Sequence, residues 1–159
     1  MYNKLKNKIA DYFNIRLPMA AYKYKTVVTM GEVNIFQNMY FANYFKLQGV
    51  CRELFVAECI NDINKIFSTT QISILTRKAN MSFIKDFTLF DKIVVEMDIT
   101  HIGKHEAELR FKFFEQGCSE LRAEGIQVIE FIGLNDEPCE IPKPILFQLR
   151  KFRTDLGNN

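Results

Sequence analysis

Arg52 is the residue whose type and position suggest chemistry most directly. It lies in residues 32–53, EVNIFQNMYFANYFKLQGVCRE, where apolar side chains recur with helical spacing. On a helix of about 100° per residue, Arg52 falls near +80° from Tyr44, in the sector that holds Cys51 and Phe55. In such a setting the five N–H donors of a guanidinium need carboxylates, carbonyls or a ligand. Arg52 therefore requires a partner.

Two interpretations of Arg52 stay open from the residues alone. In the structural one, the guanidinium pairs with a buried acid such as Asp98 or Glu130, or extends to an edge of the domain. In the functional one, it holds an oxygen atom of a ligand. Gln48 lies on the same face about one turn earlier, so the apolar sector carries a second polar side chain.

Asn34 and Asn38 precede the predicted helix and provide the second chemical feature. The first turn of a helix has unpaired N–H groups and the positive end of the helix dipole, so it can hold an oxygen that develops negative charge. Capping the helix is the ordinary role of an asparagine at this position. Tyr44 and Arg52 are separated by about 12 Å of helical rise, which leaves room for an acyl chain alongside the helix.

The elements that position these residues follow from periodicity. Residues 1–17 predict a helix packed on the domain or on a neighbouring subunit, with a docking or membrane-surface helix as the alternative. Apolar spacing predicts a long helix over residues 39–67. The predicted strands are 22–30, 72–84, 93–101, 107–113 and 121–132, followed by a loop at 135–144 and a helix at 145–156. This order favours an α+β fold in which a long central helix lies against one face of an antiparallel β-sheet.

The composition limits the class of protein. The 159 residues are enough for one domain with a buried core, and a net charge of +2 does not suggest nucleic-acid binding. The four cysteines form no CxxC pair and there are two histidines, so we expect no metal and no cofactor. No apolar run approaches the roughly 18 residues of a membrane span, and no apolar signal-peptide stretch is found, so we expect a cytoplasmic protein without membrane insertion.

A set of residues between positions 22 and 55 resembles the hotdog-fold acyl thioesterases. The likeness is greatest to the enediyne-polyketide type, which releases acyl chains from an acyl carrier protein and belongs to the 4-hydroxybenzoyl-CoA thioesterase-like superfamily. The matching residues are Tyr22-x-Tyr24, Val27-Val28, Glu32-x-Asn34, Asn38-x-Tyr40-Phe41, Tyr44, Gln48-Gly49 and Cys51-Arg52-Glu53. Leu47, Gln37 and Val33 depart from that pattern, so we do not name an enediyne precursor as the substrate.

The resemblance implies a hotdog fold, in which the antiparallel sheet wraps the long helix. Residues 1–18 would then form an N-terminal helical extension and residues 19–159 the hotdog thioesterase domain, with an extra helix at its C-terminal end. It also implies a homo-oligomer, either a dimer or a dimer of dimers (a homotetramer), with paired sheets and an acyl tunnel beside the helix at the dimer interface.

The resemblance also assigns roles to site residues. Asn34 and Arg52 match the residues linked to catalysis in the enediyne type. In the aroyl-CoA branch an aspartate stands at the position of Asn34 and serves as nucleophile or base, which an amide cannot do. The residues expected to contact substrate are Asn38, Met39, Tyr40, Tyr44 and Gln48.

These observations predict a thioester hydrolase. We expect an acyl thioesterase that removes a fatty-acyl or polyketide chain from acyl carrier protein or coenzyme A, with polyketide biosynthesis as one context. A noncatalytic acyl-binding hotdog protein and an acyltransferase that uses the same pocket are the alternatives.

Overall fold

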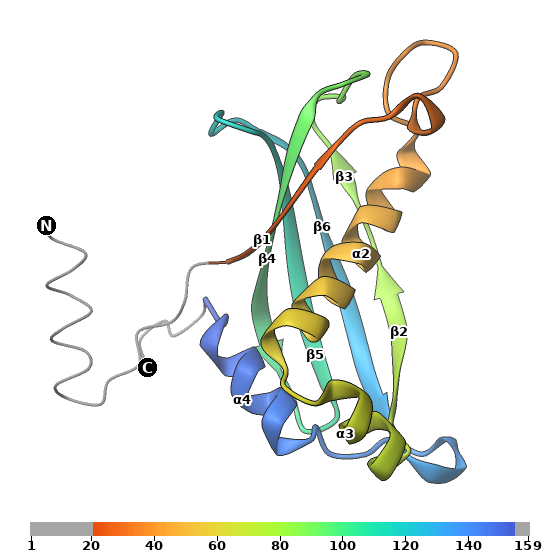
Figure 1. The fold of residues 1–159 in the computed structure, drawn as a ribbon, viewed down its shortest axis with the longest axis vertical. Coiled ribbons are helices and arrows are strands. Elements are labelled where there is room, and N and C mark those ends of the chain that lie inside the picture. Colours follow the sequence, from red (N-terminus) through yellow and green to blue (C-terminus); the bar gives the residue numbers. More distant parts are fainter. Residues whose placement is uncertain (1–20, 155–159) are drawn as a thin grey trace, which may run out of the picture.

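An antiparallel sheet of six strands forms the framework of residues 21–154, the part of the chain that this computed structural model describes (Figure 1). The main path of the sheet has the order β1, β4, β5, β6, β2, and β3 pairs with β6. The strands are β1 (Tyr22–Val27), β2 (Ser73–Ala79), β3 (Ser82–Phe83), β4 (Lys92–Ile102), β5 (Glu106–Glu115) and β6 (Leu121–Ile132). The predicted strands 93–101, 107–113 and 121–132 correspond to β4, β5 and β6, which pair antiparallel in sequence order as the predicted antiparallel sheet requires.

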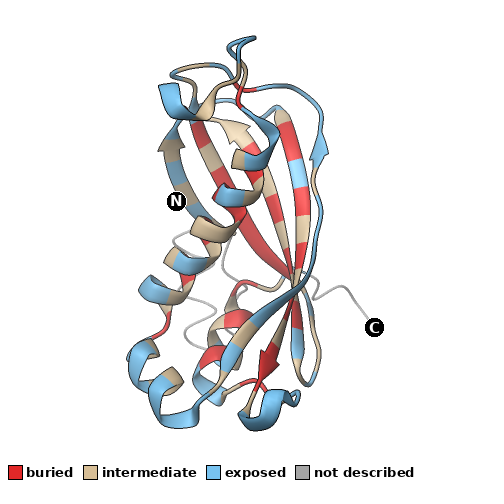
Figure 2. Ribbon diagram, turned by 90° about the vertical axis from the view of Figure 1, so that its right-hand side faces the viewer, coloured by how far each residue is buried: buried red, intermediate tan, exposed pale blue. Residues whose placement is uncertain are grey.

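Alternation of side chains gives the sheet one buried face. Along β5 the residues Ala107, Leu109, Phe111 and Phe113 are buried, while the charged residues between them are only partly covered (Figure 2). This period of two is what a strand with one face on a core requires. Gly117, at a φ of +85°, makes the turn between β5 and β6, a conformation that glycine adopts without steric cost.

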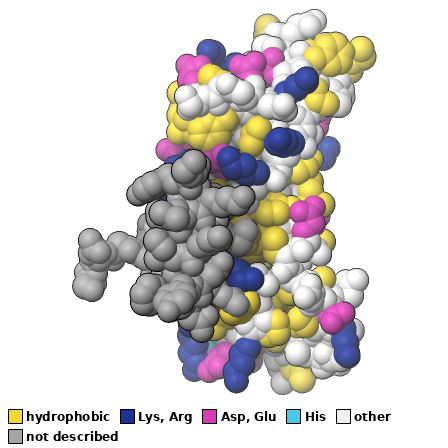
Figure 3. Space-filling view, turned by 60° about the vertical axis from the view of Figure 1, so that its left-hand side comes forward, with side chains coloured by type: hydrophobic (Ala, Val, Ile, Leu, Met, Phe, Trp, Pro, Cys, Tyr) yellow, Lys and Arg dark blue, Asp and Glu magenta, His cyan; other side chains and the backbone are white. Residues whose placement is uncertain are grey.

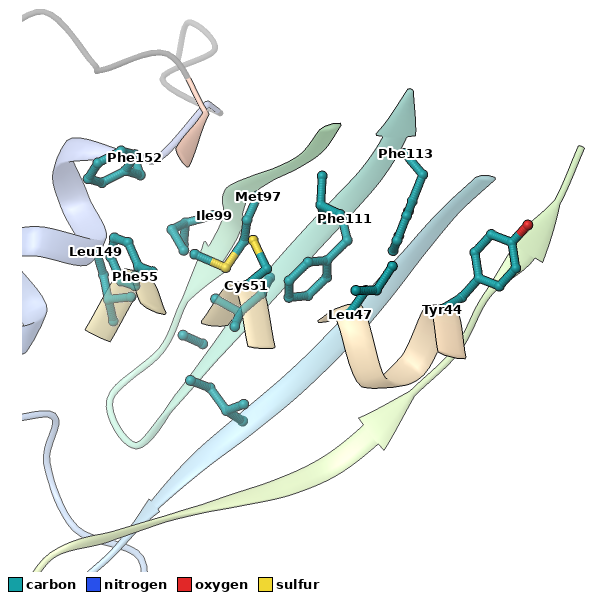
Figure 4. Packing of buried hydrophobic residues seen from close by; sticks show 14 of the residues in the cluster. Tyr44, Leu47, Cys51, Phe55, Met97, Ile99, Phe111, Phe113, Leu149 and Phe152 are labelled. Atoms are coloured by element: carbon teal, nitrogen blue, oxygen red, sulfur yellow. The ribbon is translucent and has the colours of Figure 1, made fainter. Parts of the chain in front are cut away.

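Helix α2 (Phe41–Cys59) lies across the buried face of the sheet. Its residues Leu47 and Cys51 point toward side chains of β4 and β5, whereas Phe55 lies beside Leu149 and Phe152 (Figure 4). The partners drawn there on those strands are Met97, Ile99, Phe111 and Phe113. The Tyr44 ring lies 5.6 Å from that of Phe113 on β5. A long helix covered by a curved antiparallel sheet is the α+β hotdog arrangement, and this part of the prediction is confirmed.

The predicted single helix over residues 39–67 is wrong in one respect, because it consists of two helices. Helix α2 ends at Cys59, Ile60 is extended and buried, and Asp62 has a φ of +55°. A new helix, α3 (Ile63–Thr70), then begins. The Asn61-Asp62 pair makes this turn possible, because short polar side chains tolerate the left-handed region better than most residues. Apolar spacing alone did not reveal it.

The predicted strand over residues 72–84 is also divided in two. Asn80 and Met81 lie between β2 and β3. The Asn80 N–H donates to the Ile126 carbonyl at 3.0 Å, and its Oδ1 accepts the Ile126 N–H at 2.9 Å. Strand β1 ends at Val27 rather than residue 30, because the short 3-10 helix η1 (Met30–Glu32) follows, with a capping box between Thr29 and Glu32.

Helix α4 (Lys143–Lys151) closes one end of the core. It begins two residues before the predicted start, because Pro144 occupies the first turn, where proline needs no hydrogen-bond partner. Ile145 and Leu149 are buried, and the Phe152 ring lies 5.1 Å from that of Phe55. The short 3-10 helix η2 (Leu134–Asp136) precedes α4.

The surface carries mixed charge. On the face shown in Figure 3, Lys and Arg side chains lie interspersed with Asp, Glu and apolar side chains in the part of the chain that is described. No helix within residues 21–154 is long and apolar enough to cross a membrane. The predicted N-terminal helix at 1–17 lies outside the described residues.

Candidate active site

Arg52 is held by two neutral partners. Its Nη1 donates to Thr76 Oγ1 at 2.8 Å and to Gln127 Oε1 at 3.0 Å. Within residues 21–154 no ion pair involves Arg52. The acids that the structural interpretation proposed are paired elsewhere: Asp98 with Arg110 at 2.5 Å, and Glu130 with Arg77 at 2.5 Å.

The environment of Arg52 preserves its charge. Burial lowers the pKa of the guanidinium, and nearby Glu53 opposes that shift. An arginine stays protonated throughout the physiological range even when its pKa falls. The site therefore contains a half-buried cation whose hydrogen-bond partners, Thr76 and Gln127, are neutral.

Arg52 and Glu53 line a mostly apolar groove of about 490 Å³. It runs between the second half of α2, helix α3 and the start of β2, and its volume lies within the range of small-molecule sites. Its apolar lining consists of Val56, Ala57, Ile63, Phe67, Ile72 and Ile74. The Nε and Nη2 atoms of Arg52 donate to no group in residues 21–154 and are not enclosed, so they remain available to a ligand.

Asn34 lies in a tight turn before α2. Its Oδ1 accepts the Phe36 N–H at 2.8 Å, and its own N–H donates to the Asn38 carbonyl at 2.9 Å. Gln37 completes the turn with a φ of +70°. The N-cap position of α2 is Tyr40, and no side chain caps the helix. Neither asparagine has the ordinary capping role, and the first-turn N–H groups of α2 lack a side-chain acceptor.

The residues expected to contact substrate differ in accessibility. Tyr40 is 49 % exposed at the start of α2, whereas Met39 is 3 %, Tyr44 1 % and Gln48 0 % exposed. Asn38 donates through Nδ2 to Asp86 at 2.8 Å, while its buried Oδ1 has no partner in the described chain. Contact between substrate and the three buried side chains requires the site to open, and it stays a prediction.

Tyr44 links the start of α2 to the loop that precedes β4. Its hydroxyl oxygen accepts the Phe87 N–H at 3.3 Å. The Phe87 carbonyl in turn accepts the Met39 N–H at 2.7 Å. Burial is the main cause of the raised pKa of Tyr44, so the phenol stays protonated at neutral pH.

The candidate residues form two clusters within one chain. Arg52 lies eleven residues after Phe41, the first residue of α2, which corresponds to about 16 Å along the helix axis. Asn34 lies beyond that first residue, in the preceding turn. A single chain therefore does not bring Asn34 and Arg52 to the same substrate atom.

Sequence reasoning missed Thr76 and Gln127. Both contact Arg52, and Gln127 is 5 % exposed on the inner face of β6. The signal for Gln127 was present, because its position alternates with Gly125 and Ile129 among the inward residues of that strand. Thr76 carried no comparable signal, since β2 is largely exposed.

Comparison with known proteins agrees with this geometry. The family model described as "Thioesterase-like superfamily" matches residues 28–149. The comparison with curated proteins found no match. Among solved structures, the dynemicin thioesterase, studied for polyene binding, is 25 % identical with a TM-score of 0.78, covering 84 % of this chain and 97 % of that one.

Two further solved structures share the fold at lower identity. The 1,4-dihydroxy-2-naphthoyl-CoA thioesterase Slr0204 from Synechocystis is 16 % identical with a TM-score of 0.75, covering 87 % of this chain and 99 % of that one. The hypothetical protein SAV2348 from Staphylococcus aureus, in complex with CoA, is 14 % identical with a TM-score of 0.76, covering 89 % and 92 %. Together with the family match over most of its length, these findings show that the chain belongs to the thioesterase-like superfamily, with the hotdog fold.

Proposed function

We propose that this protein hydrolyses thioesters of apolar acyl chains. The observation that carries the proposal is the Arg52 cation, which has only neutral hydrogen-bond partners in the described chain and lines an apolar groove. Membership of the thioesterase-like superfamily supports it. The groove would take the acyl chain, and Arg52 would lie close to the thioester carbonyl.

The chemistry we propose is electrostatic. A water molecule attacks the carbonyl carbon, and the oxygen develops negative charge that Arg52 and the uncapped N–H groups of α2 stabilise. Asn34 holds the water through the oxygen lone pair that its turn leaves free. The carbon–sulfur bond then breaks, and the thiolate takes up the proton that the attacking water loses, which gives the free thiol and the acid. A thiolate is a good leaving group, so no strong general base is required.

We further propose that each site is assembled from two copies of the chain. The rise of about 16 Å between the start of α2 and Arg52 prevents Asn34 and Arg52 of one chain from acting on one carbonyl. In a dimer, or a dimer of dimers, Asn34 of one copy can meet Arg52 of the other. This arrangement agrees with the tunnel at a dimer interface that the resemblance implies.

The carrier of the acyl chain is proposed from the relatives. Slr0204 is a CoA thioesterase, and SAV2348 was solved with CoA. Acyl carrier protein and coenzyme A both present the acyl group on a phosphopantetheine thiol, so one site can serve either. We therefore propose an acyl-CoA or acyl-carrier-protein substrate, including fatty-acyl and polyketide chains.

The test is hydrolysis of a panel of acyl-CoA and acyl-carrier-protein thioesters, with free thiol and free acid measured separately. Removal of an oxyanion donor costs about 2.7–4 kcal/mol of barrier, so Arg52→Ala should lower kcat by about 100-fold or more. Asn34→Ala should lower kcat as well. Unchanged turnover in both folded variants would reject the site.

The two alternatives give different products. Thiol release without free acid would indicate acyl transfer, and release of neither would indicate an acyl-binding protein. Asn34→Asp is informative because the aroyl-CoA branch carries an aspartate at this position. Faster hydrolysis by that variant would mean that the pocket also supports carboxylate chemistry.

A further inference from the structure

A chain of hydrogen bonds connects Arg52 to the backbone carbonyl of Asn80. Gln127 Oε1 accepts from Arg52, Gln127 Nε2 donates to Gln48 Oε1 at 3.2 Å, and Gln48 Nε2 donates to the Asn80 carbonyl at 3.1 Å. Gln48 is 0 % and Gln127 5 % exposed. The two glutamines in the middle of this chain of hydrogen bonds are therefore buried between α2 and β6.

The Asn80 carbonyl determines how both amides are oriented. A carbonyl oxygen only accepts, so Gln48 must present its Nε2 there and its Oε1 toward Gln127. Gln127 must then present Nε2 to Gln48, which leaves its Oε1 to face Arg52. Reversing either amide would place two donors or two acceptors in contact in a buried site, a costly arrangement.

Asn80, at the end of this chain of hydrogen bonds, is held rigidly. Asn80 is fixed to β6 by its two hydrogen bonds with Ile126. Gly125 permits the close approach, because a Cβ at that position would lie 2.3 Å from the Asn80 carbonyl oxygen and 2.4 Å from Gln48 Nε2. These contacts give Gln127 one stable orientation.

We propose that Gln127 and Gln48 are positioning residues for Arg52, an inference that rests on the proposed thioesterase function. They hold Nη1 so that the Nε and Nη2 donors face the groove, and as amides they do so without neutralising the cation. A carboxylate at position 127 would hold the guanidinium equally well but would cancel much of its field. Gln48 then serves the site through Gln127 rather than by touching substrate.

The test compares Gln127→Glu and Gln127→Met with Gln116→Glu, a matched control on the exposed turn between β5 and β6. We expect Gln127→Glu to lower kcat by about 100-fold with little change in KM, and Gln127→Met by about 10-fold. The control should resemble the wild type. In an Arg52→Ala background, the Gln127 substitutions should have no further effect on kcat, because nothing remains to be positioned.

A spectroscopic measurement separates this inference from the proposed function. In ¹⁵N-labelled protein, the Arg52 guanidinium should show restrained rotation about the Cζ–Nη bonds, and Gln127→Met should remove the restraint. Loss of activity in Arg52→Ala with wild-type kcat in folded Gln127 variants would overturn the positioning role alone. Unchanged activity in Arg52→Ala would reject the thioesterase site. The rotation of the Arg52 guanidinium, compared between wild type and Gln127→Met, would still show whether Gln127 positions Arg52.

Thr76 provides a second route if the Gln127 variants do not fold. Its hydroxyl accepts the other Nη1 hydrogen, and the residue is exposed on β2, so substitution should be tolerated. We expect Thr76→Val to lower kcat and to loosen the guanidinium, and Thr76→Ser to restore both. A Thr76→Val variant with wild-type kcat and an equally restrained guanidinium would overturn the inference.

Discussion

Arg52 combines a full positive charge with neutral hydrogen-bond partners. A buried carboxylate would hold it firmly, but the pair would have little field left for a ligand. Thr76 and Gln127 provide direction without opposite charge. The cost of partial burial is limited because Arg52 lines an open groove. This arrangement suits an oxygen that becomes negative only during a reaction.

At the same scale, Cys51 is expected to be chemically inert. It is 0 % exposed, and burial raises the pKa of its thiol to about 12, so the nucleophilic thiolate does not form near neutral pH. At pH 8, iodoacetamide should leave Cys51 unmodified in the folded protein and modify the exposed Cys118 first, as peptide mass spectrometry will show. After denaturation the pKa returns to its ordinary range, and Cys51 should react. Rapid native labelling of Cys51 would contradict this.

Gly125 is the residue at which an added methyl group should most disturb the hydrogen bonds that join Gln127, Gln48 and the Asn80 carbonyl. Gly125→Ala places a Cβ against Gln48 and Asn80, and overpacking of this kind costs about 1–3 kcal/mol. Gly49→Ala is the matched control, because nothing lies within 4 Å of its Cβ position in α2. There alanine should raise the free energy of unfolding by about 0.5–1 kcal/mol, because glycine destabilises a helix interior relative to alanine. Urea titration measures both, and effects of the same sign would refute the expectation.

At the scale of elements, the break between α2 and α3 creates the groove. The left-handed Asp62 redirects the chain, so that Ile63 and Phe67 of α3 face Val56 of α2 across an open space. A continuous helix would have carried these side chains along the axis of α2. Ile72, just before β2, and Ile74, within β2, also line the groove.

Filling this groove should change the preference for acyl length. Each methylene buried in the groove contributes about 0.8 kcal/mol, so kcat/KM should rise with chain length until the groove is full. Val56→Phe should remove that rise for long chains and leave short chains almost unaffected. Leu54→Phe is the control, since Leu54 lies about 160° from Val56 around α2. Equal losses for all chain lengths with Val56→Phe would contradict an acyl groove.

Periodicity predicted most of the elements but not their interruptions. The alternating strands around β4, β5 and β6 and the apolar face of α2 were correct because burial on one face imposes a period that a sequence displays. The breaks at Asp62 and Asn80 depend on single backbone conformations and on contacts with β6, which have no period. Phe41 is a related exception: at 100° per residue it lies on the same face of the helix as Cys51 and Phe55, yet it is 54 % exposed at the helix start.

The site was predictable only in part for the same reason. Arg52 and Gln48 were visible as polar residues at apolar positions of one helix. Their partners come from β2 and β6, which pair antiparallel beside α2 only after folding. The ion pairs of Asp98 with Arg110 and of Glu130 with Arg77 likewise form only in the tertiary structure. Charge pairing between distant strands leaves no local pattern.

At the scale of the whole molecule, the surface suggests where a second copy would pack. Ile35 and Phe36, in the turn that carries Asn34, are 89 % and 78 % exposed. Strand β2 is an edge of the sheet, and Leu75 on it is 44 % exposed. Apolar side chains and an unpaired strand edge are features that proteins usually cover. They support the proposal that Asn34 and Arg52 meet between copies.

Mixing two inactive variants tests that proposal directly. If each site takes Asn34 from one copy and Arg52 from the other, a mixed dimer of Asn34→Ala and Arg52→Ala contains one intact site and one doubly defective site. Denaturing and refolding the two variants together in equal amounts should restore about a quarter of the wild-type activity, because half of the dimers are mixed. Each variant refolded alone is the control and should stay inactive. If both residues act within a single chain, every site keeps one defect and the mixture will remain as inactive as its components.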